Sequence, residues 1–217
     1  MLNITIPSLC IICGKPASGK SYVIRYLMSC YRKKFDYGII FSNTAAFNNG
    51  FDYVPQQYVH SAYSERPIKN LMELQKGLIQ KGVRKRAFII FDDCLSGEFN
   101  SDVMNSLVSQ FRHYLITVII STQYCYKALT PLIRECCTYA CIFRQSSDRS
   151  VNATYESFGQ HFRSEKEWKE YLMLNTGDHK FLFIDVNSQS DNIADIYKVY
   201  KCPDNIPPFK LIYNTKQ

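Results

Sequence analysis

Residues 14–21 read Gly-Lys-Pro-Ala-Ser-Gly-Lys-Ser and directly follow the apolar run Leu9–Cys13. This is the pattern G-x-x-x-x-G-K-[ST] placed between a strand and a helix, which is typical of a phosphate-binding P-loop. Such a loop turns its backbone N–H groups toward a phosphate, and the next helix adds the positive end of its dipole. Nucleotide binding is therefore the favoured interpretation. The alternative is a Gly-rich turn that binds nothing.

The residue types in this loop predict which residues contact the phosphates and which one ligates the metal ion. Lys20 is expected to reach the β- and γ-phosphates of ATP, and the Ser21 hydroxyl is expected to ligate Mg²⁺. Gly14 and Gly19 allow backbone conformations and close approaches that a side chain would block. We expect nucleotide contacts from nine consecutive residues: Gly14, Lys15, Pro16, Ala17, Ser18, Gly19, Lys20, Ser21 and Tyr22.

Short apolar runs alternate with segments of helical periodicity through most of the chain. The runs 87–91 and 115–121 have the length and continuity of buried parallel strands, whereas 181–186 and 196–200 look like a late antiparallel pair. This alternation predicts an α/β fold, a three-layer sandwich around a mainly parallel central sheet. The P-loop makes it a P-loop NTPase sandwich, and the assignment to the RecA-like ATPase branch rests on the acidic pair Asp92-Asp93.

Length and composition fit one P-loop ATPase domain spanning 1–217. The motor core is expected over about 8–186, followed by a C-terminal strand and a polar, Pro-rich tail in 187–217. With 46% apolar residues the chain can bury a sizeable core. It shows no apolar stretch near the length of a membrane span, so we expect no stable membrane insertion.

Nine cysteines, an odd number, argue for free thiols in a reducing intracellular compartment. Cys10 and Cys13 have the spacing C-x-x-C, but both lie in the first expected strand, where a separation of three directs them to opposite faces. Metal chelation by this pair is therefore not expected. The net charge of +7 is only a weak sign of a polyanionic partner, because solvated basic clusters such as Arg84-Lys85-Arg86 explain it as well.

The apolar run 87–91 ends in Asp92-Asp93, which is the Walker B pattern. Asp92 is expected to hold Mg²⁺ together with Ser21 or through water. A second carboxylate at this point can orient and polarise the attacking water, and it favours the ATPase branch of P-loop proteins. The alternative for Asp93 is a cap on the following turn. The loop that follows, Cys94–Asn100, is a candidate for coupling hydrolysis to movement.

Three more side chains are catalytic candidates. Gln123 follows the strand run 115–121 and is expected to sense the γ-phosphate, because ligands of such sheets bind at the carboxyl ends of the strands. Arg112 and Arg144 could each stabilise charge on the γ-phosphate, within the chain or across a subunit boundary. An ordinary loop position for Gln123 and structural ion pairs for the two arginines are the alternatives.

These motifs resemble the genome-packaging ATPases of the FtsK/HerA superfamily, in the compact form found in large eukaryotic DNA viruses, virophages and Polinton-type elements. The resemblance rests on the P-loop, on Ile-Ile-Phe-Asp-Asp, and on the Arg-His pair before a strand that ends in Gln123. Together they cover residues 8 to about 144. Cellular members often carry Glu where this chain has Asp93.

The resemblance implies ATP and Mg²⁺ as cofactors and a homo-oligomeric ring, usually a hexamer. Such a ring drives double-stranded DNA into a preformed viral capsid, so a capsid or portal-vertex protein is an implied partner. Two rival functions stay open. A small nucleoside or nucleotide kinase would use the Asp148-Arg149 pair on its substrate, and a nucleotide-gated assembly module would bind ATP without hydrolysing it.

Overall fold

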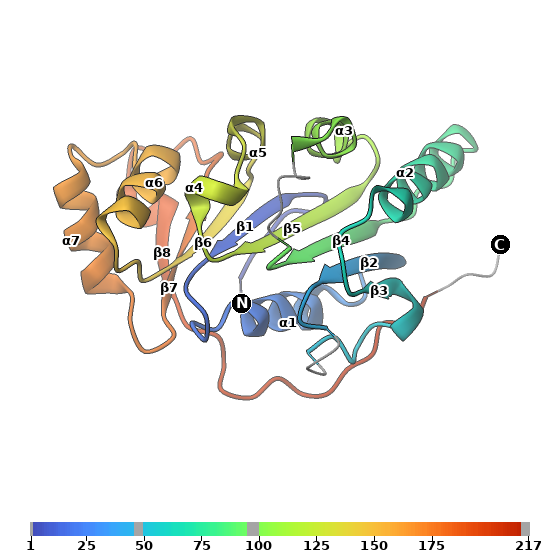
Figure 1. Ribbon diagram of the computed structural model, residues 1–217, viewed down its shortest axis with the longest axis horizontal. Coiled ribbons are helices and arrows are strands. Elements are labelled where there is room, and N and C mark those ends of the chain that lie inside the picture. Colours follow the sequence, from blue (N-terminus) through green and yellow to red (C-terminus); the bar gives the residue numbers. More distant parts are fainter. Residues whose placement is uncertain (1, 46–49, 95–99, 214–217) are drawn as a thin grey trace.

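The computed structural model describes residues 2–45, 50–94 and 100–213, which contain one eight-stranded sheet in the order β3-β2-β4-β5-β1-β6-β7-β8 (Figure 1). The first six strands in sequence are parallel: β1 (Leu9–Cys13), β2 (Tyr37–Ser42), β3 (Val59–His60), β4 (Ala87–Asp92), β5 (Ile116–Thr122) and β6 (Tyr139–Phe143). The last two, β7 (Phe181–Asp185) and β8 (Tyr197–Tyr200), are antiparallel to their neighbours. The predicted fold class is confirmed.

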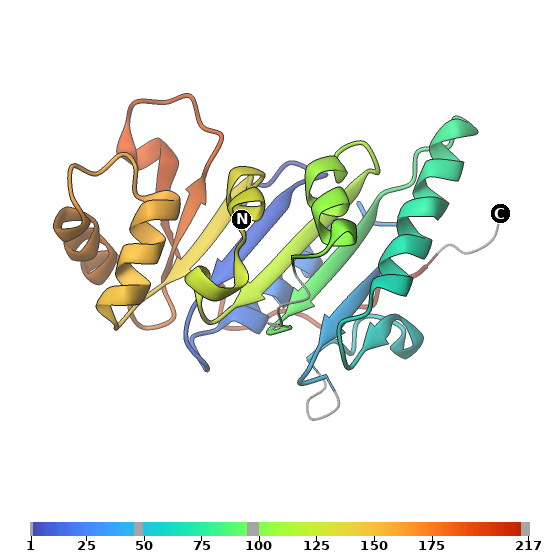
Figure 2. The same cartoon turned by 45° about the horizontal axis from the view of Figure 1, so that its top comes forward.

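Helices cover both faces of the sheet (Figures 1 and 2). One face carries α1 (Lys20–Tyr31). The other face carries α2 (Glu65–Gln80), α3 (Asp102–Gln110), α4 (Cys125–Ala128), α5 (Pro131–Glu135), α6 (Asp148–Phe158) and α7 (Glu165–Asn175). Two short helices complete the chain: η1 (Gln56–Tyr58) and α8 (Ile193–Ile196). None of the helices in the described ranges is long and apolar enough to cross a membrane.

Several of these helices begin at a residue whose side chain caps the free N–H groups of the first turn. Ser101 accepts a hydrogen bond from Met104 N before α3, and Ser164 accepts one from Glu167 N before α7. Thr130 and Ser147 cap α5 and α6 in the same way. Each cap is worth about 1 kcal/mol, so sequence signals fix where these helices start.

The sheet has an apolar layer on each side, because β1 and its parallel neighbours are buried on both faces. Along β1 the side chains alternate: Ile11 and Cys13 enter the layer under α2–α7, whereas Cys10 and Ile12 enter the layer under α1. Burial of each such aliphatic side chain contributes roughly 1.5–3 kcal/mol. The predicted opposite orientation of Cys10 and Cys13 is confirmed, and all nine cysteines are free thiols.

The described part of the C-terminal tail packs against the rest of the domain. We call its described part, residues 201–213, the C-terminal strap; it crosses the α1 face from β8 toward β2 and β3 (Figure 1). Leu211 is buried and its N–H donates to Tyr53 O at 2.8 Å, and the Tyr213 hydroxyl donates to Gly38 O at 2.7 Å. The sequence predicts a polar tail because the apolar residues of this segment are isolated from one another. Phe209 and Leu211 nevertheless pack against the core and anchor the strap.

Candidate nucleotide-binding site

The P-loop joins β1 to α1 in a conformation that requires its glycines. A Cβ on Gly14 would lie 2.6 Å from Ser18 Oγ and 2.8 Å from Phe143 Cβ, so no side chain fits there. Gly19, the N-cap residue of α1, has a φ of 109°, a conformation that L side chains avoid. The N–H of Gly14 donates to Thr122 O at 3.1 Å, which ties the loop to β5.

Lys20 is nearly buried at the base of this loop, with 5% of its side chain exposed. Its Nζ donates to the Lys15 carbonyl at 3.1 Å and lies 3.7 Å from Asp93 Oδ2. Ser21 and Tyr22 follow on the first turn of α1 and are exposed. The sequence-predicted phosphate and magnesium ligands of the P-loop therefore face the same edge of the sheet as Asp93.

Asp92 ends β4 and is buried. Its Oδ2 accepts a hydrogen bond from the hydroxyl of Ser42 at 3.2 Å, because Ser42 is its register partner on β2. Burial raises the pKa of Asp92 and the neighbouring charge of Asp93 adds to the rise, while the nearby hydroxyls of Ser121 and Ser42 and the charge of Lys20 oppose it. Sequence reasoning missed Ser42. The available signal was a polar residue ending the apolar run that precedes the Walker B strand.

Asp93 adopts a left-handed backbone conformation with φ of 50°. Successive strand residues point to opposite faces, so this break lets Asp93 turn its side chain toward the P-loop while Asp92 stays in the sheet. Gln123 Nε2 donates to Asp93 Oδ2 at 3.3 Å, on the same oxygen that faces Lys20. The structure thus brings Lys20, Asp92, Asp93 and Gln123 together. Their catalytic roles stay predictions.

The two arginine candidates lie at opposite edges of the sheet. Arg112 follows α3 and precedes β5, so it lies at the amino ends of the parallel strands, with its guanidinium 5.0 Å from the Phe111 ring centre. Within one chain it therefore cannot reach a nucleotide on the P-loop. Arg144 follows β6 at the same edge as the P-loop, where its Nη2 donates to Met173 O at 3.1 Å at the end of α7.

The loop between α7 and β7 also contacts the P-loop, and sequence reasoning missed it. The ring Nδ1 of His179 lies 3.1 Å from Ser18 O, and Asp178 and His179 have φ values of 48° and 60°. Because β7 is antiparallel to β6, its amino end lies where β6 and β1 have their carboxyl ends. The position of His179 thus depends on a strand direction that no local pattern specifies.

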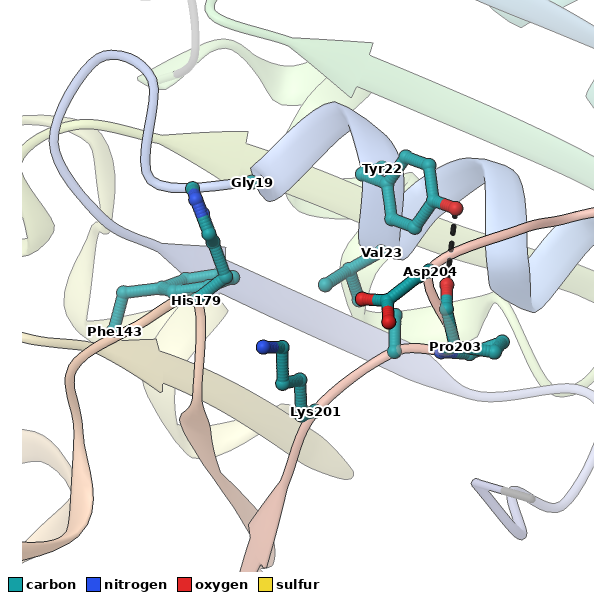
Figure 3. A pocket seen from close by; sticks show the side chains of 9 residues that line it. Gly19, Tyr22, Val23, Phe143, His179, Lys201, Pro203 and Asp204 are labelled. Atoms are coloured by element: carbon teal, nitrogen blue, oxygen red, sulfur yellow. Dashed lines mark hydrogen bonds between the residues drawn. The ribbon is translucent and has the colours of Figure 1, made fainter.

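Two hollows flank the P-loop. A cleft of about 320 Å³, which we call the strap cleft, lies between the start of α1 and the C-terminal strap; Tyr22, His179, Lys201 and Asp204 are among its lining residues (Figure 3). A second hollow of about 280 Å³ lies between the P-loop and the loop that joins α7 to β7, and its lining includes Lys15, Arg144 and Lys180. Both open at the edge where phosphates are expected to bind.

The acidic pair fits a divalent cation. Asp92 Oδ1 and Asp93 Oδ1 are both buried, and neither has a hydrogen-bond partner among the described residues. Buried polar atoms usually have partners, and Mg²⁺ with its water molecules would satisfy them. The described residues hold no group of three or more His, Cys, Asp and Glu side chains suited to a metal.

The candidate coupling loop Cys94–Asn100 cannot be placed against these groups, because residues 95–99 lie outside the described ranges. Its first residue, Cys94, is buried and its thiol donates to Asp92 O at 3.4 Å. The basic cluster Arg84-Lys85-Arg86 precedes β4 and lies at the edge opposite the P-loop, as its place before a parallel strand predicts.

A mainly parallel sheet with a P-loop after β1, an acidic pair at the end of β4 and Gln123 after β5 defines a P-loop NTPase fold. The model of the family described as poxvirus A32 protein matches residues 5–163, and the chain belongs to this family. The chain is 30% identical over 186 residues to the uncharacterized protein 075L of Invertebrate iridescent virus 6, covering 84% of this chain and 71% of that protein. It is 26% identical over 211 residues to the uncharacterized protein L437 of Acanthamoeba polyphaga mimivirus, covering 91% and 73%.

Solved structures share the fold. The genome-packaging NTPase B204 of Sulfolobus turreted icosahedral virus 2, in complex with ATPγS, matches with a TM-score of 0.65 at 19% identity, over 91% of this chain and 98% of that one. The conjugation coupling protein TcpA with ATPγS matches with a TM-score of 0.61 at 15% identity, over 84% and 58%. The resemblance predicted from the motifs is thus confirmed: the chain belongs to a viral family and has the fold of a viral genome-packaging NTPase.

Proposed function

We propose that this protein is an ATP-driven motor that moves double-stranded viral DNA into a preformed capsid. The observation that carries the ATPase part is the position of Asp93, whose carboxylate faces Lys20 and accepts a hydrogen bond from Gln123. A carboxylate beside the phosphate-binding lysine is suited to orient an attacking water. Membership of the poxvirus A32 family and the fold shared with packaging NTPase B204 support the DNA-packaging part.

Within this proposal we assign a role to each residue of the site. Lys20 and the N-terminus of α1 bind the β- and γ-phosphates. Ser21 and Asp92 would hold Mg²⁺, which would supply positive charge to neutralise the phosphates. Asp93 orients the water and accepts its proton, and Gln123 changes partner when the γ-phosphate leaves. Gln123 and Lys20 share Asp93 Oδ2, so the state of the phosphates is transmitted to β5.

The rival functions lack comparable support. In a kinase, the Asp148-Arg149 pair would have to be free to bind a phosphoryl acceptor. Asp148 instead pairs with Lys169 at 2.7 Å, and Arg149 lies 4.2 Å from the ring centre of Tyr126. A nucleotide-gated module that does not hydrolyse ATP would account for the contact between Asp93 and the nearly buried Lys20, but not for the hydrogen bond that Gln123 donates to the same carboxylate oxygen.

The motor is proposed to act as one P-loop ATPase domain in a homo-oligomeric ring, with an arginine of one subunit completing the site of the next. Its grip on DNA would use the phosphate backbone and not the base sequence, so binding should weaken steeply as salt rises. A viral capsid or portal-vertex protein is the proposed docking partner, and assembly would take place inside the host cell.

Steady-state ATP hydrolysis with and without double-stranded DNA tests this proposal. We expect Mg²⁺-dependent hydrolysis that unrelated duplexes stimulate to a similar extent, and that Asp93→Asn abolishes. A panel of nucleosides and nucleotides serves as the control for phosphoryl transfer. ADP formation that requires one of these acceptors would establish a kinase instead, and ATP binding without hydrolysis would establish the gated module.

A further inference from the structure

The strap cleft lies where the phosphate-binding loop gives way to α1. Gly19 and Tyr22 form its α1 side, Lys201 and Asp204 belong to its strap side, and Phe143 and His179 are among the residues at the P-loop end (Figure 3). Its lining is mostly apolar, with two charged side chains from the strap. A site of this size, with apolar walls and a few polar groups, is typical of small-molecule binding sites.

The strap side of this cleft is fixed in place near the P-loop. The Tyr22 hydroxyl donates to Pro203 O at 3.0 Å, which joins α1 to the strap. Lys201 pairs with Asp178 at 2.9 Å, in the loop whose His179 contacts the P-loop. Two separate contacts therefore hold the strap at a set distance from the phosphate-binding residues.

The far end of the strap is anchored as well. The ring of Phe209 stacks on Tyr53 with centres 4.8 Å apart, and the Arg25 guanidinium lies over both rings at 5.7 and 5.5 Å. Arg25 also pairs with Asp52 at 2.6 Å. Beyond this cluster the Tyr213 hydroxyl donates to the β2 backbone. The strap is thus held at both ends, and the wall of the cleft exists before any ligand enters.

We propose that the strap cleft binds the nucleoside end of a nucleoside triphosphate and that the C-terminal strap determines nucleoside selectivity. This inference rests on the proposed binding of the phosphates at the P-loop. Tyr22 and Phe143 offer apolar surface to a flat base. The Asp204 carboxylate accepts hydrogen bonds only, which matches the hydroxyl groups of a ribose and the exocyclic amino group of adenine.

Dissociation constants for ATP and for tripolyphosphate, each with Mg²⁺, separate the two halves of the site. Tripolyphosphate can occupy the P-loop but leaves the cleft empty. For the wild-type protein we expect ATP to bind at least about tenfold more tightly. Asp204→Ala should weaken ATP about fivefold and leave tripolyphosphate unchanged. Asp191→Ala is the matched control, because this exposed acid follows β7 at the opposite edge of the sheet.

Two further arms test the strap itself. Tyr213→Phe removes the anchor to Gly38 without changing the cleft lining, and it should weaken ATP by about two- to fivefold but not tripolyphosphate. Hydrogen exchange of the strap amides should slow with ATP and not with tripolyphosphate. 2′,3′-Dideoxy-ATP distinguishes the two partners of Asp204: a loss of affinity in the wild type that is absent from Asp204→Ala identifies the ribose, and no loss identifies the base.

The outcomes separate this inference from the proposed function. Equal affinities for ATP and tripolyphosphate, or an Asp204→Ala variant that weakens both to the same degree, would overturn the role of the strap cleft alone. Binding of neither ligand to the wild-type protein would overturn nucleotide binding at the P-loop and this inference with it.

Discussion

The Nζ atom of Lys20 lies 3.7 Å from Oδ2 of Asp93, although the two residues belong to different strand–loop units. Lys20 is almost fully buried, so its charge needs a partner, and Asp93 supplies one while its own side chain is 25% exposed. A phosphate that binds Lys20 must compete with this carboxylate. Nucleotide binding would therefore free the Asp93 carboxylate to orient the attacking water. The ion pair between Lys20 and Asp93 would in this way link nucleotide binding to hydrolysis.

Replacing Asp93 should separate binding from hydrolysis. We expect Asp93→Asn to retain ATP binding, because the competing negative charge on Lys20 is removed, and to lose hydrolysis by on the order of 10²-fold or more. Calorimetric titration with ATP and a steady-state phosphate-release assay measure the two effects. Asp191→Asn, an exposed acid at the far edge of the sheet, serves as the control. Near-normal turnover in Asp93→Asn would remove this residue from the mechanism.

Asp92 should make the protein less stable as pH rises. Burial raises the pKa of this carboxyl above its ordinary value, so the folded state holds its proton more tightly than the unfolded state does. Stability from this group is fully present below the ordinary aspartate pKa and is lost as pH rises through the raised one. Asp92→Asn should therefore raise the Tm at pH 8. A gain of about 1 kcal/mol in the free energy of unfolding would correspond to a few degrees. The same variant should abolish Mg²⁺-dependent hydrolysis.

Thermal melts of the wild-type protein and Asp92→Asn between pH 4 and pH 8, without nucleotide or metal, give the comparison. The difference in Tm should narrow toward the acid end, because the wild-type carboxyl is then protonated. A difference that stays constant across this range would mean that Asp92 titrates normally and that the gain has another origin.

Removing the Ser42 hydroxyl should destabilise the folded protein, because this hydroxyl donates a hydrogen bond to the buried Asp92 carboxylate. Ser42→Ala deletes the hydroxyl that donates to Asp92 Oδ2 at 3.2 Å, and it leaves a buried carboxylate with fewer partners. The expected loss of stability is about 1–3 kcal/mol at neutral pH. Denaturant unfolding measures it, and Ser42→Thr, which keeps the hydroxyl, is the matched control. Equal stability of Ser42→Ala and wild type at pH 7 would contradict the assigned hydrogen bond.

Local sequence patterns predicted the fold class and the P-loop, because a continuous apolar run and a Gly-rich turn depend on neighbouring residues alone. They also predicted that Asp93 and Gln123 lie at the carboxyl ends of strands, where ligands of such sheets bind. They did not predict Ser42 or His179, whose positions depend on strand order and direction. The C-terminal strap was missed for a related reason: Phe209 and Leu211 show no strand or helix period, and they become an anchor only through contacts with Tyr53 and Arg25, which are distant in the sequence.

The positions of Arg112 and Arg144 lead to different predictions for the two residues. Arg144 lies beside the P-loop of its own chain, whereas Arg112 lies at the opposite edge of the sheet and can reach a nucleotide only on another subunit. An arginine that acts across a subunit boundary can contribute about 10³-fold or more in turnover. If Arg112 is that residue, Arg112→Ala should be nearly inactive alone, and its specific activity should not recover with concentration.

Mixing variants tests this assignment. An Arg112→Ala subunit still carries an intact Asp93, and an Asp93→Asn subunit still carries an intact Arg112, so a mixed ring contains some complete sites. We expect such mixtures to regain turnover, whereas mixtures of Arg144→Ala with Asp93→Asn should regain it only if Arg144 also acts across the boundary. Steady-state hydrolysis over a range of mixing ratios is the measurement. If Arg112→Ala hydrolyses ATP at the wild-type rate at every protein concentration, Arg112 is a surface residue held by Phe111 and the charge donor must be sought elsewhere.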